Sequence, residues 1–196
     1  SFFNFNSKLI INYKSNSNFS NGFLFTNNNS TNLLKDDYSS TSVNSFGFVT
    51  NFEKLDNPFN PRKGFKIKSE IAYGWKETYA IDTVTNNTLK SPNFNGNLSF
   101  SSYLSLLKRT TFKIKLSGST IQNNILYENE LTRIGGYKTI RGFDEESIWV
   151  SSFVLGNFEF RYLIDEKSNV FLFSDFAWTE SKTNNFLMED YFQSFG

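Results

Sequence analysis

The chain has 196 residues and a formal net charge of +1, so its charge balance does not favour nucleic acid as a partner. It contains no cysteine and no histidine, which excludes thiol chemistry, disulfides and the commonest acid–base and metal-binding side chain. Its 24 phenylalanines stand in a polar chain rich in asparagine and serine. That combination is expected where strands alternate lipid-facing apolar residues with lumen-facing polar ones.

Apolar side chains recur at every second position in eight segments, which is the pattern of β-strands. In the clearest segment Phe65, Ile67 and Ile71 alternate with Lys66, Lys68 and Glu70. No apolar run approaches the roughly 20 residues of a membrane helix. The predicted strands span residues 3–13, 19–26, 43–55, 65–76, 92–106, 110–120, 147–162 and 170–178, and residues 191–196 resemble the start of another.

The connections between these segments alternate between short and long. Outer-membrane barrels have short periplasmic turns and long outer loops, whereas a soluble two-sheet sandwich gives no reason for such alternation. We therefore predict an all-β fold, an antiparallel transmembrane β-barrel. The short connections are 14–18, 56–63, 107–110 and 163–169, and the long ones are 27–42, 77–91, 121–146 and 179–190.

If the apolar face meets lipid, the opposite face lines a polar lumen. Counting in steps of two places many charged side chains on that face, and a mixed-charge interior holds water, a plug, or both. The predicted inward charges are Lys66, Lys68, Glu70, Lys76, Lys113, Lys115, Glu159, Arg161 and Asp175. A loop arginine that reached the acids among them would form a strong bidentate contact in a shielded lumen.

The connection 121–146 holds such an arginine, Arg141, among several glycines. Taken alone, an arginine in a loop is usually solvated. The same connection carries the adjacent acids 144–146, which are also usually solvated. Its Gly135-Gly136 pair lacks the spacing and following helix of a phosphate-binding loop. We find no catalytic constellation, and predict that the chain is not an enzyme and holds no metal or cofactor.

Four motifs in order resemble one family, the BamA/TamA-type outer-membrane assembly superfamily, also termed the bacterial surface antigen family. The first is a periplasmic turn with Asp56, Pro61 and Gly64, and the second is the stretch 127–130. The last is a pair of strands with inward acids, 157–161 and 173–175. Between these lies the loop motif made by Gly135, Gly136, Ile140, Arg141, Gly142 and Phe143.

The resemblance implies a sixteen-stranded barrel whose sixth outer loop folds back into the lumen. It also implies that the arginine of this loop bonds inward acids of the following strands, which are Glu159 and Asp175 here. Residues 1–196 would then be a partial, C-terminal portion of the barrel domain, with about eight strands and a lumen-folded loop at 121–146.

The implied function is to insert other proteins into the bacterial outer membrane or to translocate them across it. The implied partners are the lipid bilayer, unfolded outer-membrane or secreted proteins and accessory lipoproteins, and no nucleic acid. Two alternatives stay open. One is a passive porin-like channel or small eight-stranded barrel, since eight strands can close alone. The other is a membrane anchor or translocator for an enzyme, such as a patatin-like one, fused upstream.

Overall fold

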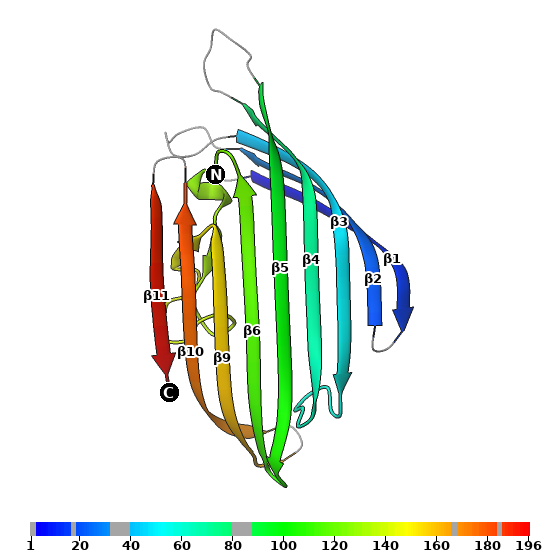
Figure 1. Cartoon of the computed structure of the whole chain (residues 1–196), viewed down its shortest axis with the longest axis vertical. Coiled ribbons are helices and arrows are strands. Elements are labelled where there is room, and N and C mark those ends of the chain that lie inside the picture. Colours follow the sequence, from blue (N-terminus) through cyan, green and yellow to red (C-terminus); the bar gives the residue numbers. More distant parts are fainter. Residues whose placement is uncertain (1–2, 17–18, 32–39, 80–87, 166–167, 184–185) are drawn as a thin grey trace.

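Nine antiparallel strands form a single continuous sheet in the computed structural model, which describes residues 3–16, 19–31, 40–79, 88–165, 168–183 and 186–196. Their order is β1-β2-β3-β4-β5-β6-β9-β10-β11, so each strand pairs with its neighbour in the chain except where a loop separates β6 from β9 (Figure 1). The strands are β1 (Phe3–Asn16), β2 (Phe19–Thr31), β3 (Ser40–Leu55), β4 (Gly64–Tyr79), β5 (Thr88–Leu107), β6 (Thr110–Asn123), β9 (Ser152–Leu163), β10 (Asn169–Lys182) and β11 (Leu187–Phe195).

The all-β antiparallel prediction is confirmed, and the sheet is open rather than closed into a barrel. Most strands are longer than expected, and β5 reaches 20 residues. Most of the extra residues are polar and lie in the expected loops. The connections 14–18, 27–42 and 77–91 shorten accordingly, and their central residues 17–18, 32–39 and 80–87 lie outside the described residues.

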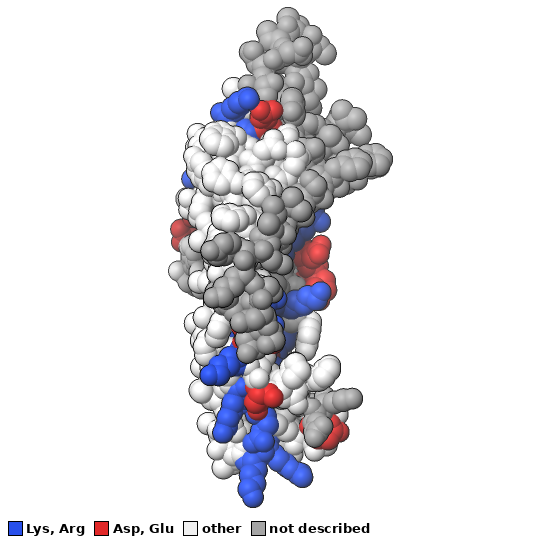
Figure 2. All heavy atoms as spheres, turned by 90° about the vertical axis from the view of Figure 1, so that its right-hand side faces the viewer, with Lys and Arg blue, Asp and Glu red and all other residues white. Residues whose placement is uncertain are grey.

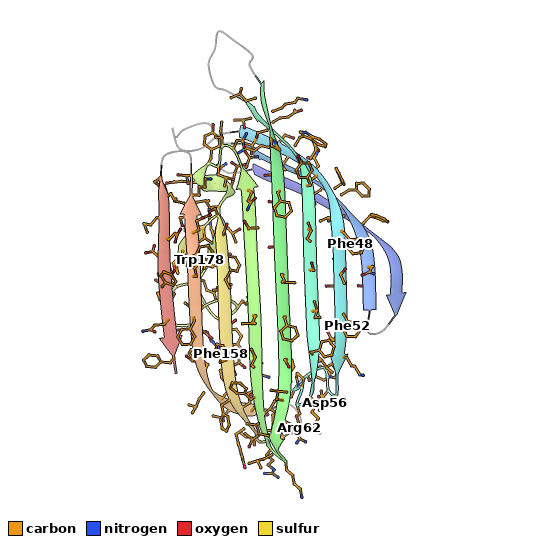
Figure 3. The ribbon with its side chains drawn as sticks, viewed as in Figure 1. Phe48, Phe52, Asp56, Arg62, Phe158 and Trp178 are labelled. Carbon is orange, nitrogen blue, oxygen red and sulfur yellow. The ribbon has the colours of Figure 1, made fainter. Side chains whose placement is uncertain are left out.

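One face of the sheet carries large exposed apolar side chains. Phe48 is 45% exposed and Ile71 is 51% exposed, whereas Val49 and Ala72, the next residues on the opposite face, are buried. Phe48 and Phe158 are among the aromatic side chains marked along the strands in Figure 3. No helix in the described residues is long and apolar enough to cross a membrane.

Positive charge gathers at the end of the sheet that carries the short turns. Seen from the β1 side, lysine and arginine side chains project from this lower end (Figure 2). Lys54, Lys63, Lys108 and Arg109 are exposed there. A band of lipid-facing apolar side chains with charged side chains at the end of the strands is the arrangement expected of a β-sheet wall that spans a bilayer.

Two strand predictions need correction. The expected strand 147–162 divides into β8 (Ile148–Val150), which leaves the main sheet, and β9, which belongs to it. Counting in steps of two from Val154 and Phe158 predicts Val150 on the lipid face, but it is fully buried, because β8 packs on the inner side of the sheet. Residues 191–195 belong to a nine-residue strand, β11, which begins at Leu187 within the expected loop 179–190.

Candidate functional site

The connection between β6 and β9 folds back against the inner side of the sheet. It contains a single 3-10 turn, η1 (Glu128–Glu130), and a short hairpin of β7 (Thr132–Ile134) and β8. In Figure 1 this segment, coloured yellow-green, lies behind β9 and β10. Ser151 joins it to both neighbouring strands, because its carbonyl accepts from Ile121 N at 2.8 Å and its N–H donates to Glu180 O at 2.8 Å. We call residues 124–151 the plug loop.

A small apolar core holds the plug loop on β9 and β10. Ile134, Ile140 and Val150 from the loop pack with Leu155 of β9 and Ala177 of β10. All five side chains are at most 4% exposed. A segment inside a polar lumen must bury its own apolar side chains, and this cluster does so against the inner wall. Ile140, predicted from the motif, therefore has a packing role beside Arg141.

Arg141 binds Asp175 with three hydrogen bonds. Its Nε donates to Oδ2 at 2.8 Å, its Nη2 donates to Oδ1 at 2.6 Å and its backbone N–H donates to Oδ2 at 3.1 Å. Asp175 is fully buried and Arg141 is 8% exposed. A bidentate guanidinium–carboxylate pair of this kind is directional and strong where water is excluded.

Glu159 is the second acid in reach of Arg141 but it is shared. It accepts from Arg141 Nη1 at 3.0 Å and also pairs with Lys113 at 2.9 Å and with Arg161 at 2.5 Å. Among the described side chains, by contrast, Arg141 is the only ion-pair partner of Asp175. The two acids are thus unequal, and Asp175 depends on the loop for its direct ion pair.

Three glycines of the motif adopt a backbone conformation that other residues rarely reach. Gly135 has φ +125°, Gly136 has φ +82° and Gly142 has φ +85°. A Cβ on Gly136 would lie 2.0 Å from the carboxylate carbon of Glu145, whose Oε1 accepts from Tyr137 N at 3.1 Å. These positions let the chain reverse twice around the Arg141 tip, which is the use to which glycine is suited.

The tip has further contacts that the motif did not predict. Phe143 packs edge-on against Phe192 of β11, with ring centroids 5.3 Å apart. Asn157 Nδ2 donates to Thr139 O at 2.8 Å, and Lys115 Nζ donates to Lys138 O at 3.0 Å. The period-two pattern had placed Lys115 on the inner face, but it offered no signal for Phe192.

The predicted turn residues form a separate cluster at the short-turn end, where Asp56 and Arg62 are marked in Figure 3. Asp56 Oδ1 accepts from the backbone N–H groups of Asn57, Arg62 and Lys63 at 2.9–3.0 Å. Gly64 has φ +116°, and a Cβ there would lie 2.0 Å from Lys54 O. Pro61 is buried in the same turn. This cluster is structural and is not brought together with Arg141.

The acids 144–146 do not form a catalytic or metal-binding group. All three are exposed, and Glu145 binds the backbone of its own loop. Within the described ranges no group of three or more acids, histidines or cysteines could hold a metal ion. The arrangement at Arg141 can hold a loop in place, and it offers no nucleophile with an adjacent base.

A comparison with protein families matches residues 4–152 to the family described as haemolysin secretion/activation protein ShlB/FhaC/HecB. The match covers well over half of the chain, from β1 through the plug loop, and the two acids that bind Arg141 lie just beyond it. A search among curated proteins finds no match.

Proposed function

The chain belongs to the haemolysin secretion/activation protein ShlB/FhaC/HecB family, and from that premise we propose that its plug loop gates a pore for a secreted polypeptide. The family consists of outer-membrane transporters of Gram-negative bacteria, so the chain resides in the bacterial outer membrane. The open sheet supplies one part of the pore wall. Further strands, to a total of sixteen by the family resemblance, would complete the barrel.

The observation that carries this proposal is the pairing of Arg141 with Asp175. It joins the tip of the plug loop to the middle of β10, on the face opposite the exposed aromatic residues. In the proposed resting state the plug loop blocks the lumen. The latch, which we define as Arg141 with Asp175 and Glu159, keeps it there.

The latch can open and close reversibly, because water that enters the lumen can hydrate both the guanidinium and the carboxylates once they separate. A buried guanidinium and a buried carboxylate that separate without water would each be left uncompensated, at a cost of several kcal/mol. A polypeptide that enters the lumen brings water and its own polar groups with it. The latch therefore opens together with pore filling and closes again when the polypeptide has left.

Secretion by the whole transporter tests this proposal. We expect Arg141→Ala and Asp175→Asn to reduce secretion of the cognate protein and to increase protease cleavage within the plug loop. Lys138→Ala is the matched control, because Lys138 is exposed and uses only its carbonyl oxygen in the contact with Lys115. Equal cleavage in the Arg141 variant, the Lys138 variant and the parent protein would overturn the latch.

A second candidate is insertion of β-barrel proteins into the outer membrane, with accessory lipoproteins as partners. The ordered loop and turn motifs favour it, because they resemble those of the assembly proteins. Depleting the protein would then lower the amounts of several unrelated outer-membrane barrels. A loss confined to one secreted protein would favour secretion alone.

A passive channel is distinguished by conductance. The latched plug predicts a mostly closed pore in lipid bilayers, and a permanently open, solute-selective pore would contradict it. We also propose that the chain has no catalytic activity of its own, as expected for a transporter. An enzyme fused to it would carry its own site.

A further inference from the structure

A second buried charge binds the plug loop far from the latch. Lys76 of β4 is fully buried, and its ammonium donates to Ile125 O at 2.6 Å and to the carboxylate of Glu130. It also lies 5.0 Å from the centre of the Tyr127 ring. The same Glu130 oxygen accepts from Tyr127 N at 3.0 Å, which closes the first turn of the loop around the ammonium. We call Lys76 with residues 125–130 the anchor.

The anchor and the latch stand on different parts of the wall. The plug loop leaves β6 at Asn123, yet Lys76 lies on β4, with β5 between them. Two strand spacings correspond to about 10 Å, so the first part of the loop crosses the inner face of β5. The rest of the loop turns back to β9 and β10. Lys76 is near the end of β4 at Tyr79, whereas Asp175 is in the middle of β10.

The two sites share no residue. Within the described ranges, the side-chain hydrogen bonds of Lys76 are with residues 125–130, and the hydrogen bonds of Arg141 are with Glu159 and Asp175. Sites that share no partner act additively, whereas members of one network do not. Breaking the latch should therefore leave the anchor in place.

We infer that Lys76 is a positioning residue that makes the plug loop a hinged strap rather than a free plug. Residues 125–131 stay fixed to β4, while the part beyond them, which carries Arg141, detaches from β9 and β10. This inference rests on the proposed gating function. A strap fixed at one end remains beside the pore while a polypeptide passes, and it returns to the same latch afterwards.

Spin labels on the two parts of the loop test the hinge in the whole protein, reconstituted in lipid. The 196 residues contain no cysteine, so Glu128→Cys and Tyr137→Cys report on the fixed and the moving part. In the Arg141→Ala background we expect the label at 137 to change from mostly immobile to mostly mobile and the label at 128 to keep its spectrum. In the Lys76→Met background the label at 128 should become mostly mobile.

Two further variants serve as a control and as an alternative to Lys76→Met. Lys90→Met removes a solvent-exposed ion pair with Glu77 between β4 and β5, and should leave the label at 128 immobile. Glu130→Gln removes the acid of the anchor without changing any strand, so it serves where the Lys76 variant does not assemble. A label at 128 that becomes mobile with Arg141→Ala, or stays immobile with Glu130→Gln, overturns the inference.

The two proposals fail separately. Loss of secretion is the readout for gating, and label mobility at 128 is the readout for the anchor. If Arg141→Ala leaves secretion intact while the label at 128 responds only to the anchor variants, the gate is wrong and the anchor holds. If secretion is lost but both labels move together, the gate holds and the hinge is wrong.

Discussion

The inner face of the sheet has two unlike regions. Over β9 and β10 it presents buried charges, Glu159 and Asp175, that the plug loop neutralises. Over β2 to β6 many neutral polar side chains bind one another across neighbouring strands, and they stand beside the lysines that contact the plug loop or Glu159, which are Lys76, Lys113 and Lys115. Thr26 and Ser45 hydroxyls lie 2.5 Å apart, for example. The first region is incomplete without the loop, whereas the second satisfies much of its hydrogen bonding within the wall. Only the first can therefore act as a switch.

The largest effect should come from removing the charge that the first region depends on. Arg141→Ala leaves Asp175 buried without a cation and should destabilise the closed loop by about 3–5 kcal/mol. Asp175→Asn added to Arg141→Ala removes the orphaned charge, so the double variant should recover part of that loss. Chemical unfolding of the folded barrel measures both. Strictly additive losses would show that the pair is not coupled.

A smaller effect should follow from straining the backbone of the plug loop at one of its glycines. Gly136→Ala forces a side chain into φ +82° and against Glu145, which should cost about 1–3 kcal/mol. Gly96→Ala on the lipid-facing side of β5 is the control, because the atom nearest to an added Cβ there is a ring atom of Phe94 at 3.3 Å and the φ of Gly96 is not in the left-handed range. Thermal stability compares the two, and a larger shift for the Gly96 variant would reverse the expected order.

The neutral polar pairs over β2 to β6 should tolerate substitution. Ser119 Oγ donates to Asn97 Oδ1 at 2.6 Å between β6 and β5, and this hydrogen bond joins two strands of the wall rather than the wall and the plug loop. Ser119→Ala removes one neutral hydrogen bond, so we expect a loss of about 1 kcal/mol or less. Loop proteolysis should be unchanged. Cleavage raised to the level of the Arg141 variant would show that these neutral pairs also hold the loop.

The smallest effect should be the pH response of an acid outside the lumen. Burial would raise the pKa of Asp56, but backbone hydrogen bonds from Lys63, Arg62 and Asn57 outweigh it and lower the pKa below its ordinary value. A lowered folded-state pKa stabilises the turn above the unfolded value, near pH 4, and this contribution is lost as the pH falls through the folded value. Proteolysis at 56–63 with an acid-active protease should rise below about pH 4. Asp56→Asn should remove most of this pH dependence.

Alternation along the strands was enough to predict which side chains share a face. It placed Glu159 and Asp175 inward, together with Glu70, and the family resemblance implied that the first two are the acids that bind Arg141. Alternation gave no prediction where both faces are polar, as at residues 27–31 of β2, because asparagine, serine and threonine carry no contrast between the faces. Alternation also predicts the wrong face for Val150. This residue continues the two-residue period of β9, although the chain leaves the main sheet there.

Contacts between distant segments were the other limit. The pattern placed Lys76 inward but could not identify Glu130 as its partner, since nothing in the local sequence encodes which strand a loop crosses. Phe192 was assigned to a stub strand with no stated neighbour. Its contact with Phe143 depends on how far the loop tip reaches, which follows from the glycine conformations rather than from the strand pattern.

A reversible cross-link between the loop tip and the wall tests the central claim most directly. A Cβ on Gly142 would lie 3.4 Å from the Cβ of Ser194 on β11, a separation close to that of a disulfide. The reduced Gly142→Cys/Ser194→Cys protein carries the strain of a side chain at φ +85° and is therefore the baseline. Its secretion should stop when the protein is oxidised and resume on reduction, because transport requires the tip to leave the wall. Secretion by the fully oxidised protein at the rate of the reduced one would contradict the account.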